Sequence, residues 1–166
     1  MTQIVIFDCE YLTKAGAMGR MWSDHNDPDP IVVQIGAVRL DLENKASIVD
    51  QIKIYIKPED RHGTPYRLDP YFVDLTGITT EVIERDAVDL GSALRQFDAF
   101  SGGTRLWSWG KDELFALGVS CFIHGIAPPI APARFGNLKL ILSEAGMPDA
   151  DIKSTSSGEI ADYYGV

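Results

Sequence analysis

The sequence predicts an α/β domain built on a mixed β-sheet. Strand-like runs and amphipathic helical runs alternate along most of the 166 residues, after an initial hairpin. The apolar fraction of 45% and the charged fraction of 23% are typical of a globular protein that is long enough to form a core. We therefore expect residues 1–166 to form one domain.

Three strand-like runs open the chain. Gln3–Phe7 is followed by the almost continuously apolar run Pro30–Leu40, which is typical of a central strand covered on both faces. In Ser47–Ile56, isoleucines alternate with Lys and Tyr, which is the period of a strand with one exposed face. Because Asp41–Lys45 is a natural hairpin connection, the second and third strands are expected to be antiparallel neighbours. The polar stretch Ser23–Pro30 is expected to be a loop.

Helical signals dominate from residue 68 onward. A short helix is expected to begin near Pro70 and to end at Gly77, and Thr79 or Thr80 is expected to cap a second one that runs through Glu84. The remaining expected elements are a helix over 89–100, a strand over 104–109, a helix over 111–124, a Pro- and Ala-rich loop over 125–134, a helix over 137–146 and the start of a last helix over 156–165.

Composition and charge exclude several classes of protein. A net charge of −9 argues against a protein that coats nucleic acid through general electrostatics. It permits an enzyme that holds a polyanion through bound divalent cations. No apolar run approaches the ~20 residues that span a bilayer, and no secretion signal is recognisable. Cys9 and Cys121 lie in apolar segments without metal-ligand spacing, which indicates buried reduced thiols, argues against zinc and fits a cytoplasmic location without membrane contact.

Two carboxylates stand at the end of the first strand-like run, "IVIFDCEYLT". Asp8 and Glu10 are one residue apart, so on an extended strand they share a face while Cys9 points to the other. The run contains no Lys or Arg that could compensate them, and two acids on one face can jointly hold Mg²⁺ or Mn²⁺. The structural alternative is a strand-end pair that faces water.

A second pair, Asp112 and Glu113, follows the fourth expected strand at the start of a helix. The helix dipole favours negative charge there, and this is a sufficient structural explanation. The functional explanation is that both acids come to the same sheet edge as Asp8 and Glu10. Carboxylates that converge there from two strand ends would form a two-metal site.

The segments "VIFDCEYL", "IVVQIGAVRL", "FVDLTGIT" and "LWSWGKDEL" occur in the order and rough spacing of the DEDD family of 3′–5′ exonucleases. The chain resembles this family over nearly its whole length. The family includes the proofreading subunit of DNA polymerase III and ribonuclease T. The "WSWG" segment is most similar to the branch related to the histone-mRNA exonuclease.

The resemblance implies a ribonuclease H-like fold, with a mixed five-stranded sheet and helices on both sides. It also implies two Mg²⁺ or Mn²⁺ ions held by Asp8, Glu10 and an acid of the second motif. The family's register places that acid at Glu113, whereas chemical identity favours Asp112. We expect Asp8, Glu10 and Asp112 to be catalytic and Glu113 to be a further candidate ligand.

The implied reaction is hydrolysis of the terminal phosphodiester at a free 3′ end of single-stranded DNA or RNA, which releases nucleoside monophosphates. The resemblance also raises the possibility of a homodimer. Candidate contacts to the terminal nucleotides are Tyr11, Leu12, Phe72, Leu75, Thr76 and Gly77. The structural alternatives are that Phe72 is partly core and that Gly77 only ends a helix.

One part of the family pattern is absent from the sequence. The family's His-x-x-x-x-Asp on a last helix does not occur, because the three histidines are followed five residues later by Pro30, Arg67 and Pro129. One explanation is that the segment carrying this helix is not represented in the chain. The other is that Glu159 or Asp162 replaces the last acid. As it stands, the 166-residue chain is expected to bind metal weakly and to hydrolyse poorly or not at all.

Two other functions compete with this interpretation. One is an inactive exonuclease-like domain that binds nucleic acid or protein. The other is a phosphatase of the haloacid dehalogenase type with Asp8 as nucleophile. That family requires a second Asp in place of Glu10, and the early hairpin fits it poorly.

Overall fold

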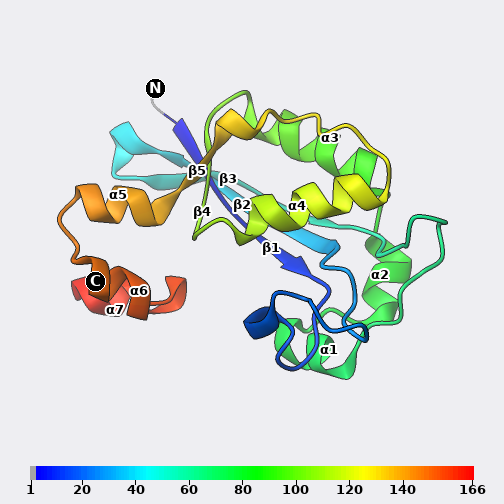
Figure 1. The fold of residues 1–166 in the computed structure, drawn as a ribbon. Helices are drawn as coiled ribbons and strands as arrows, with labels where there is room; N and C mark the ends of the chain where they lie inside the picture. Colours follow the sequence, from blue (N-terminus) through cyan, green and yellow to red (C-terminus); the bar gives the residue numbers. More distant parts are fainter. Residues whose placement is uncertain (1–2) are drawn as a thin grey trace.

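The fold, seen in a computed structural model that describes residues 3–166, is built on one five-stranded mixed sheet (Figure 1). Its strand order is β3-β2-β1-β4-β5. The strands are β1 (Gln3–Tyr11), β2 (Val32–Asp41), β3 (Ser47–Tyr55), β4 (Leu106–Ser108) and β5 (Phe135–Asn137). The first three strands are antiparallel neighbours, whereas β4 is parallel to β1 and β5 is parallel to β4. The predicted α/β class and mixed sheet are confirmed.

The helices largely follow the local signals of the sequence. They are α1 (Pro70–Thr76), α2 (Thr80–Asp86), α3 (Leu90–Ser101), α4 (Asp112–Ile123), α5 (Leu138–Glu144), α6 (Asp149–Ser154) and α7 (Ile160–Tyr164). At the start of α1, the Asp69 side chain accepts from the backbone N–H of Tyr71, and Gly77 ends the helix in the left-handed conformation. Of the two predicted caps of α2, Thr79 is the one that accepts a backbone hydrogen bond, from Val82.

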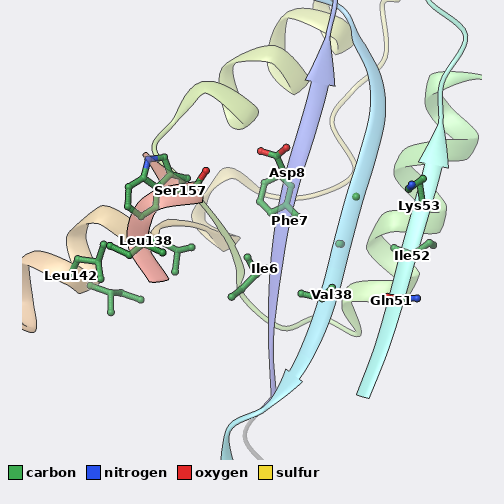
Figure 2. Close-up of a pocket in the computed structure, with 15 residues that line it drawn as sticks. Ile6, Phe7, Asp8, Val38, Gln51, Ile52, Lys53, Leu138, Leu142 and Ser157 are labelled. Carbon is green, nitrogen blue, oxygen red and sulfur yellow. The ribbon is translucent and has the colours of Figure 1, made fainter. Parts of the chain in front are cut away.

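The two faces of the sheet differ in how they are covered. Val5, Phe7 and Cys9 alternate along β1 and point into the main core, where they pack with apolar residues of α3 and α4. Ile6 and Asp8 therefore project from the opposite face. Figure 2 shows α5 residues Leu138 and Leu142 across from that face. The face of the sheet that carries Asp8 thus remains partly open.

A second apolar cluster lies where β1 ends. It joins residues of β1's continuation, β2 and the α1–α2 region: Leu12, Ile31, Val33, Leu68, Phe72 and Ile78. This cluster anchors α1 and α2, which Figure 1 shows beyond the end of β1. It therefore fixes the loop after α1 near the carboxyl end of that strand.

The structure corrects several predicted boundaries. Strand β1 continues to Tyr11, so Asp8 and Glu10 lie within the strand and not after it. β5 and α6 lie in segments for which no strand or separate helix was expected. The expected last helix is a 3₁₀ turn at Ser157–Glu159 followed by the short α7.

Two further sequence expectations concern the cysteines and the membrane. Cys9 and Cys121 are both buried and free, as expected. Among residues 3–166, none of the helices combines the length and apolarity that crossing a bilayer would require.

Candidate active site

Strand β1 presents Asp8 and Glu10 on one face of the sheet. Asp8 lies opposite Gly36 of β2, where no Cβ stands beside the carboxylate, and Glu10 lies opposite Gln34. The register between β1 and β2 shifts immediately after Glu10. Irregularities of this kind bend a strand and re-aim side chains at sheet edges. Asp8 and Glu10 therefore lie on one face near the carboxyl end of β1, and the strand becomes irregular just beyond them.

Helix α4 brings the second pair of acids to the same place. It follows β4, which runs parallel to β1, so its first turn lies near the carboxyl end of β1. The buried Ser120 hydroxyl accepts from the backbone N–H of Val32 at 2.9 Å and donates to the carbonyl of Ala116 at 2.7 Å. This link fixes α4 against β2. It also fixes the position of Asp112 and Glu113.

Asn137 stabilises the loop that leads into α4. Its Oδ1 accepts from the backbone N–H of Gly110 at 3.1 Å and from that of Lys139 at 2.9 Å. The first bond ties β5 to the residues just before Asp112, and the second caps α5. Asn137 therefore couples three elements around the acids.

All four predicted acids line one cavity of about 240 Å³. The other residues around it are Cys9, Tyr11, Thr13, Met18, Leu75, Thr76, Trp109 and Ser157. None of the lining residues is basic. Carboxylates grouped without a neighbouring cation carry an electrostatic cost that a bound cation would relieve.

Glu113, and not Asp112, is the buried acid of the second pair. Glu113 is only 5% exposed, whereas Asp112 is exposed. Burial raises the pKa of Glu113 to about 7, although a hydrogen bond from Ser108 opposes the rise and the nearby Asp8 adds to it. Among the described residues, nothing hydrogen-bonds to the buried Oε2 of Glu113.

The two acids of β1 are perturbed in the same direction. Burial raises the pKa of Asp8, and the neighbouring Glu113 carboxyl partly offsets that rise. The pKa of Glu10 is raised by burial and by the charge of Asp8. Three carboxyl groups of one cavity therefore resist ionisation, chiefly because burial removes them from water.

The fit of a metal ion can be judged from these donors. Within the described 3–166, no three His, Cys, Asp or Glu side chains are grouped closely enough to hold one. The chemistry of the donors is nevertheless that of a Mg²⁺ or Mn²⁺ site, because all are hard carboxylate oxygens and one buried oxygen of Glu113 is unpaired. The donor atoms are therefore of the type that Mg²⁺ or Mn²⁺ prefers, but in this structure they are not close enough together to bind one.

Of the residues predicted to contact the nucleotide, some line the acidic cavity and others do not. Tyr11, Leu75 and Thr76 line the acidic cavity. The expectation for Leu12 and Phe72 is corrected, because both are buried in the second apolar cluster and do not reach the cavity. Gly77 ends α1 at φ +71° and is not among the residues around the cavity.

Met18 is a lining residue that sequence reasoning did not find. It belongs to the stretch between β1 and β2, which Arg20 and Asp27 organise through a two-pronged ion pair with an Arg20 Nε–Asp27 Oδ2 distance of 2.8 Å. The indole N–H of Trp22 also donates to the carbonyl of Leu12, and the Trp22 ring lies 5.5 Å from that of Tyr11. These contacts join residues 7 to 11 positions apart in a loop, so no helical or strand periodicity in the sequence predicted them.

The histidines are not part of this cavity. His25 and His62 are exposed, and His124 follows the last turn of α4. None of the three is among the lining residues. The structure therefore assigns no histidine to the acidic cluster.

A larger apolar groove of about 980 Å³ adjoins the acidic cavity (Figure 2). Asp8, Trp109 and Ser157 line both. The rest of the groove is formed by β1, β2 and β3 on one side and by α5 on the other, with Ile160 of α7 at its margin. Lys53 is the one basic residue in its lining.

No protein-family model and no curated protein sequence matches this chain. Solved structures do. A complex named ExoI/SSB-Ct superposes with a TM-score of 0.58 at 14% identity, covering 87% of this chain and 30% of the other. A product-bound exonuclease I gives 0.57 at 15% identity, over 86% and 31%. Exonuclease I from E. coli with a dT13 oligonucleotide gives 0.57 at 14% identity, over 87% and 30%.

These comparisons establish the fold. At such low identity they assign it to the exonuclease, ribonuclease H-like architecture and transfer no residue roles. The chain spans about a third of the length of the exonuclease I chains that it matches. The chemistry must therefore be argued from the cavity itself.

Proposed function

We propose that this chain is a metal-dependent 3′–5′ exonuclease domain that acts on single-stranded DNA or RNA. The observation that carries the proposal is the set of four acids, from the end of β1 and the start of α4, that line one cavity whose lining contains no basic residue. The fold supports it, because solved structures of exonuclease I share this architecture.

Asp8, Glu10 and Glu113 are the proposed principal ligands for Mg²⁺ or Mn²⁺, with Asp112 as an outer candidate. Asp112 was the acid chosen from the sequence, and we now prefer Glu113 because it is buried beside Asp8. A bound divalent cation would supply an activated water and charge stabilisation for phosphodiester hydrolysis. The carboxylates would orient the cation, and Tyr11, Leu75 and Thr76 would border the terminal nucleotide.

The direct test is digestion of 5′-labelled single-stranded DNA and RNA in Mn²⁺ or Mg²⁺. Because the sequence lacks the family's last His-Asp motif, we expect slow hydrolysis, so the digestion uses the chain in excess over the substrate. Products should then shorten one nucleotide at a time from the 3′ end. Asp8→Asn and Glu113→Gln should each lower the rate by about 100-fold or more, because each removes a ligand. Asp112→Asn should have a smaller effect. Glu84→Gln, an exposed acid on α2, is the matched control.

The outcomes separate the alternatives. A 3′-blocked substrate that is cut equally well would contradict exonuclease action. Loss of activity in Asp112→Asn but not in Glu113→Gln would reverse the choice between the two acids. Digestion that survives Asp8→Asn would place the reaction elsewhere or in a contaminant.

A second candidate is a domain of the same fold that binds nucleic acid or a protein without cutting. The observation that favours it is that no three potential ligands in the described chain form a metal-holding group. Oligonucleotide binding without digestion in either metal would support it. The phosphatase alternative has lost its support, since β1 pairs with an antiparallel hairpin strand.

A further inference from the structure

Trp109 lies where the acidic cavity and the apolar groove meet. It comes directly after β4 and three residues before Asp112, and it lines both spaces. Asp8 and Ser157 also line both, so among the described residues Trp109 is the aromatic side chain that the two linings share. A strand of nucleic acid whose end occupied the acidic cavity and which continued toward the groove would therefore pass this ring.

The Trp109 indole is not used by the core. It is partly buried and belongs to neither apolar cluster. The indole N–H of Trp22 donates to a backbone carbonyl, whereas in the part of the chain that the structure describes the N–H of Trp109 has no acceptor. Trp107 differs as well, because its ring lies against Gly136 and carries Arg105 over it at 4.8 Å. Trp109 thus offers ring surface and an N–H donor beside the cavities.

Lys139 places a positive charge over the same ring. Its Nζ lies 5.2 Å from the centroid of the Trp109 ring, a position in which the ring attracts a cation. Among residues 3–166, Lys139 takes part in no ion pair. No basic residue lines the acidic cavity itself. Lys139 is therefore a cation without a carboxylate partner, held next to the cavity and available to a phosphate group.

Asn137 fixes the ring and the cation relative to each other. Its Oδ1 accepts from the backbone N–H of Gly110, the neighbour of Trp109, at 3.1 Å and from that of Lys139 at 2.9 Å. Figure 2 shows Leu138, which precedes Lys139, across the groove from the strands. The two side chains are thus arranged before any ligand binds, which lowers the entropic cost of binding one.

We propose that Trp109 and Lys139 form a subsite for one nucleotide of a single strand, with the base stacked on the indole and a phosphate at the Lys139 ammonium. The inference rests on the proposed function, which places the 3′ end at the acids, so the subsite holds the nucleotide next to the terminal one. From there the strand continues toward the groove, where Lys53 is the basic residue of the lining. Because stacking tolerates every base, the subsite adds affinity without sequence preference.

The test is binding of a thymidine octamer with phosphorothioate linkages, which resist hydrolysis, in MgCl₂. Anisotropy of a 5′-labelled octamer gives the affinity, and quenching of tryptophan emission by the unlabelled octamer reports a base stacked on an indole. Trp109→Leu removes the ring, and Lys139→Gln removes the charge. Lys45→Gln is the matched control, because it changes the net charge equally in the turn between β2 and β3 and lines neither space.

We expect Trp109→Leu to weaken binding roughly 5- to 150-fold and to remove most of the quenching. Trp109→Phe keeps a smaller ring and should lose less affinity. Lys139→Gln should make the slope of log affinity against log NaCl concentration less steep by about 0.7, which corresponds to one phosphate contact on a single strand. Lys45→Gln should leave that slope unchanged. If Trp109→Leu does not fold, the salt slope of Lys139→Gln decides the case.

The outcomes separate the subsite from the proposed function. If Trp109→Leu and Lys139→Gln bind as Lys45→Gln does, the subsite is wrong, and digestion of an ordinary strand by the natural chain would leave the exonuclease proposal standing. If binding requires Trp109 and Lys139 but an ordinary strand is not digested, the subsite stands and the exonuclease proposal fails. An unchanged salt slope in Lys139→Gln would contradict the phosphate contact. No binding of the octamer by the natural chain would overturn the subsite.

Discussion

At the scale of single residues, the burial of Glu113 determines the pKa of its carboxyl group. Its carboxyl group is buried at the start of α4, near Asp8 and hydrogen-bonded to the side chain of Ser108. The sequence placed an acidic pair at this helix start and led us to choose Asp112, whereas the burial of Glu113 leads us to prefer the second acid. That choice depends on the rotation of α4 against β1, which Ser120 and other distant contacts set.

The raised pKa of Glu113 makes stability depend on pH. The pKa is about 7 in the folded chain against an ordinary value of 4.5, so the folded state holds the proton more tightly than the unfolded state does. Stability from this group is present below pH 4.5 and is lost as pH rises to about 7. We expect Glu113→Gln to be more stable than the natural chain at pH 8, by about 1 to 3 kcal/mol in the absence of divalent cations, and similar to it at pH 4.5.

Urea unfolding at the two pH values measures this difference. Glu81→Gln is the control, because the hydroxyl of Thr79 lowers the pKa of Glu81 and removing that charge should give no gain at pH 8. If the Glu113→Gln gain were the same at both pH values, burial of the charged form would not be its cause.

At the scale of elements, β5 is a strand that the local sequence pattern did not predict. Its three residues carry no strand period, and they pair with β4 only because the fold brings them together. A Cβ at Gly136 would stand 2.4 Å from the Trp107 ring, so the strand needs a glycine there. The longer elements were foreseeable from their own residues, as the apolar spacing of α3 and the Pro70 start and Gly77 end of α1 illustrate.

Asn137 gives β5 its connection to the acids, and this can be measured. Asn137→Ala removes the cap of α5 and the bond to Gly110, so we expect a loss of about 1 to 2 kcal/mol in unfolding free energy. Asn137→Asp keeps an acceptor oxygen and should retain most of the stability. Chemical denaturation of the two variants tests this. An equal loss in both would mean that the amide nitrogen, and not the acceptor, is what the fold requires.

At the scale of the whole molecule, the predicted class rested on the order of strands and helices, which the chain itself displays. The convergence of β1 and α4 on one cavity followed from parallel strands that end at one edge. That Ser157 lines the same cavity as Asp8 did not follow, because the two residues are about 150 positions apart along the sequence and meet through tertiary packing. Sequence patterns thus predicted which acids come together, whereas tertiary contacts determine which other residues line the cavity around them.

The clustered acids in a chain of net charge −9 lead to a prediction for the whole fold. A cation that binds the folded cavity and not the unfolded chain raises the midpoint of thermal unfolding by mass action. At pH 8, where the carboxyl groups ionise more fully, 10 mM MgCl₂ or MnCl₂ should raise this midpoint by more than NaCl of equal ionic strength does. Each kcal/mol of binding corresponds to about 2 to 4 °C for a chain of this size.

The control for general screening is the double variant Asp8→Asn with Glu113→Gln. It keeps nearly all of the acidic surface, so sodium should affect it as it affects the natural chain, whereas the additional effect of the divalent salt should disappear. A divalent effect of the same size in both proteins would assign the cations to the surface. The absence of any divalent effect in the natural chain would mean that its four acids do not hold a cation, and the binding-domain alternative would then be preferred.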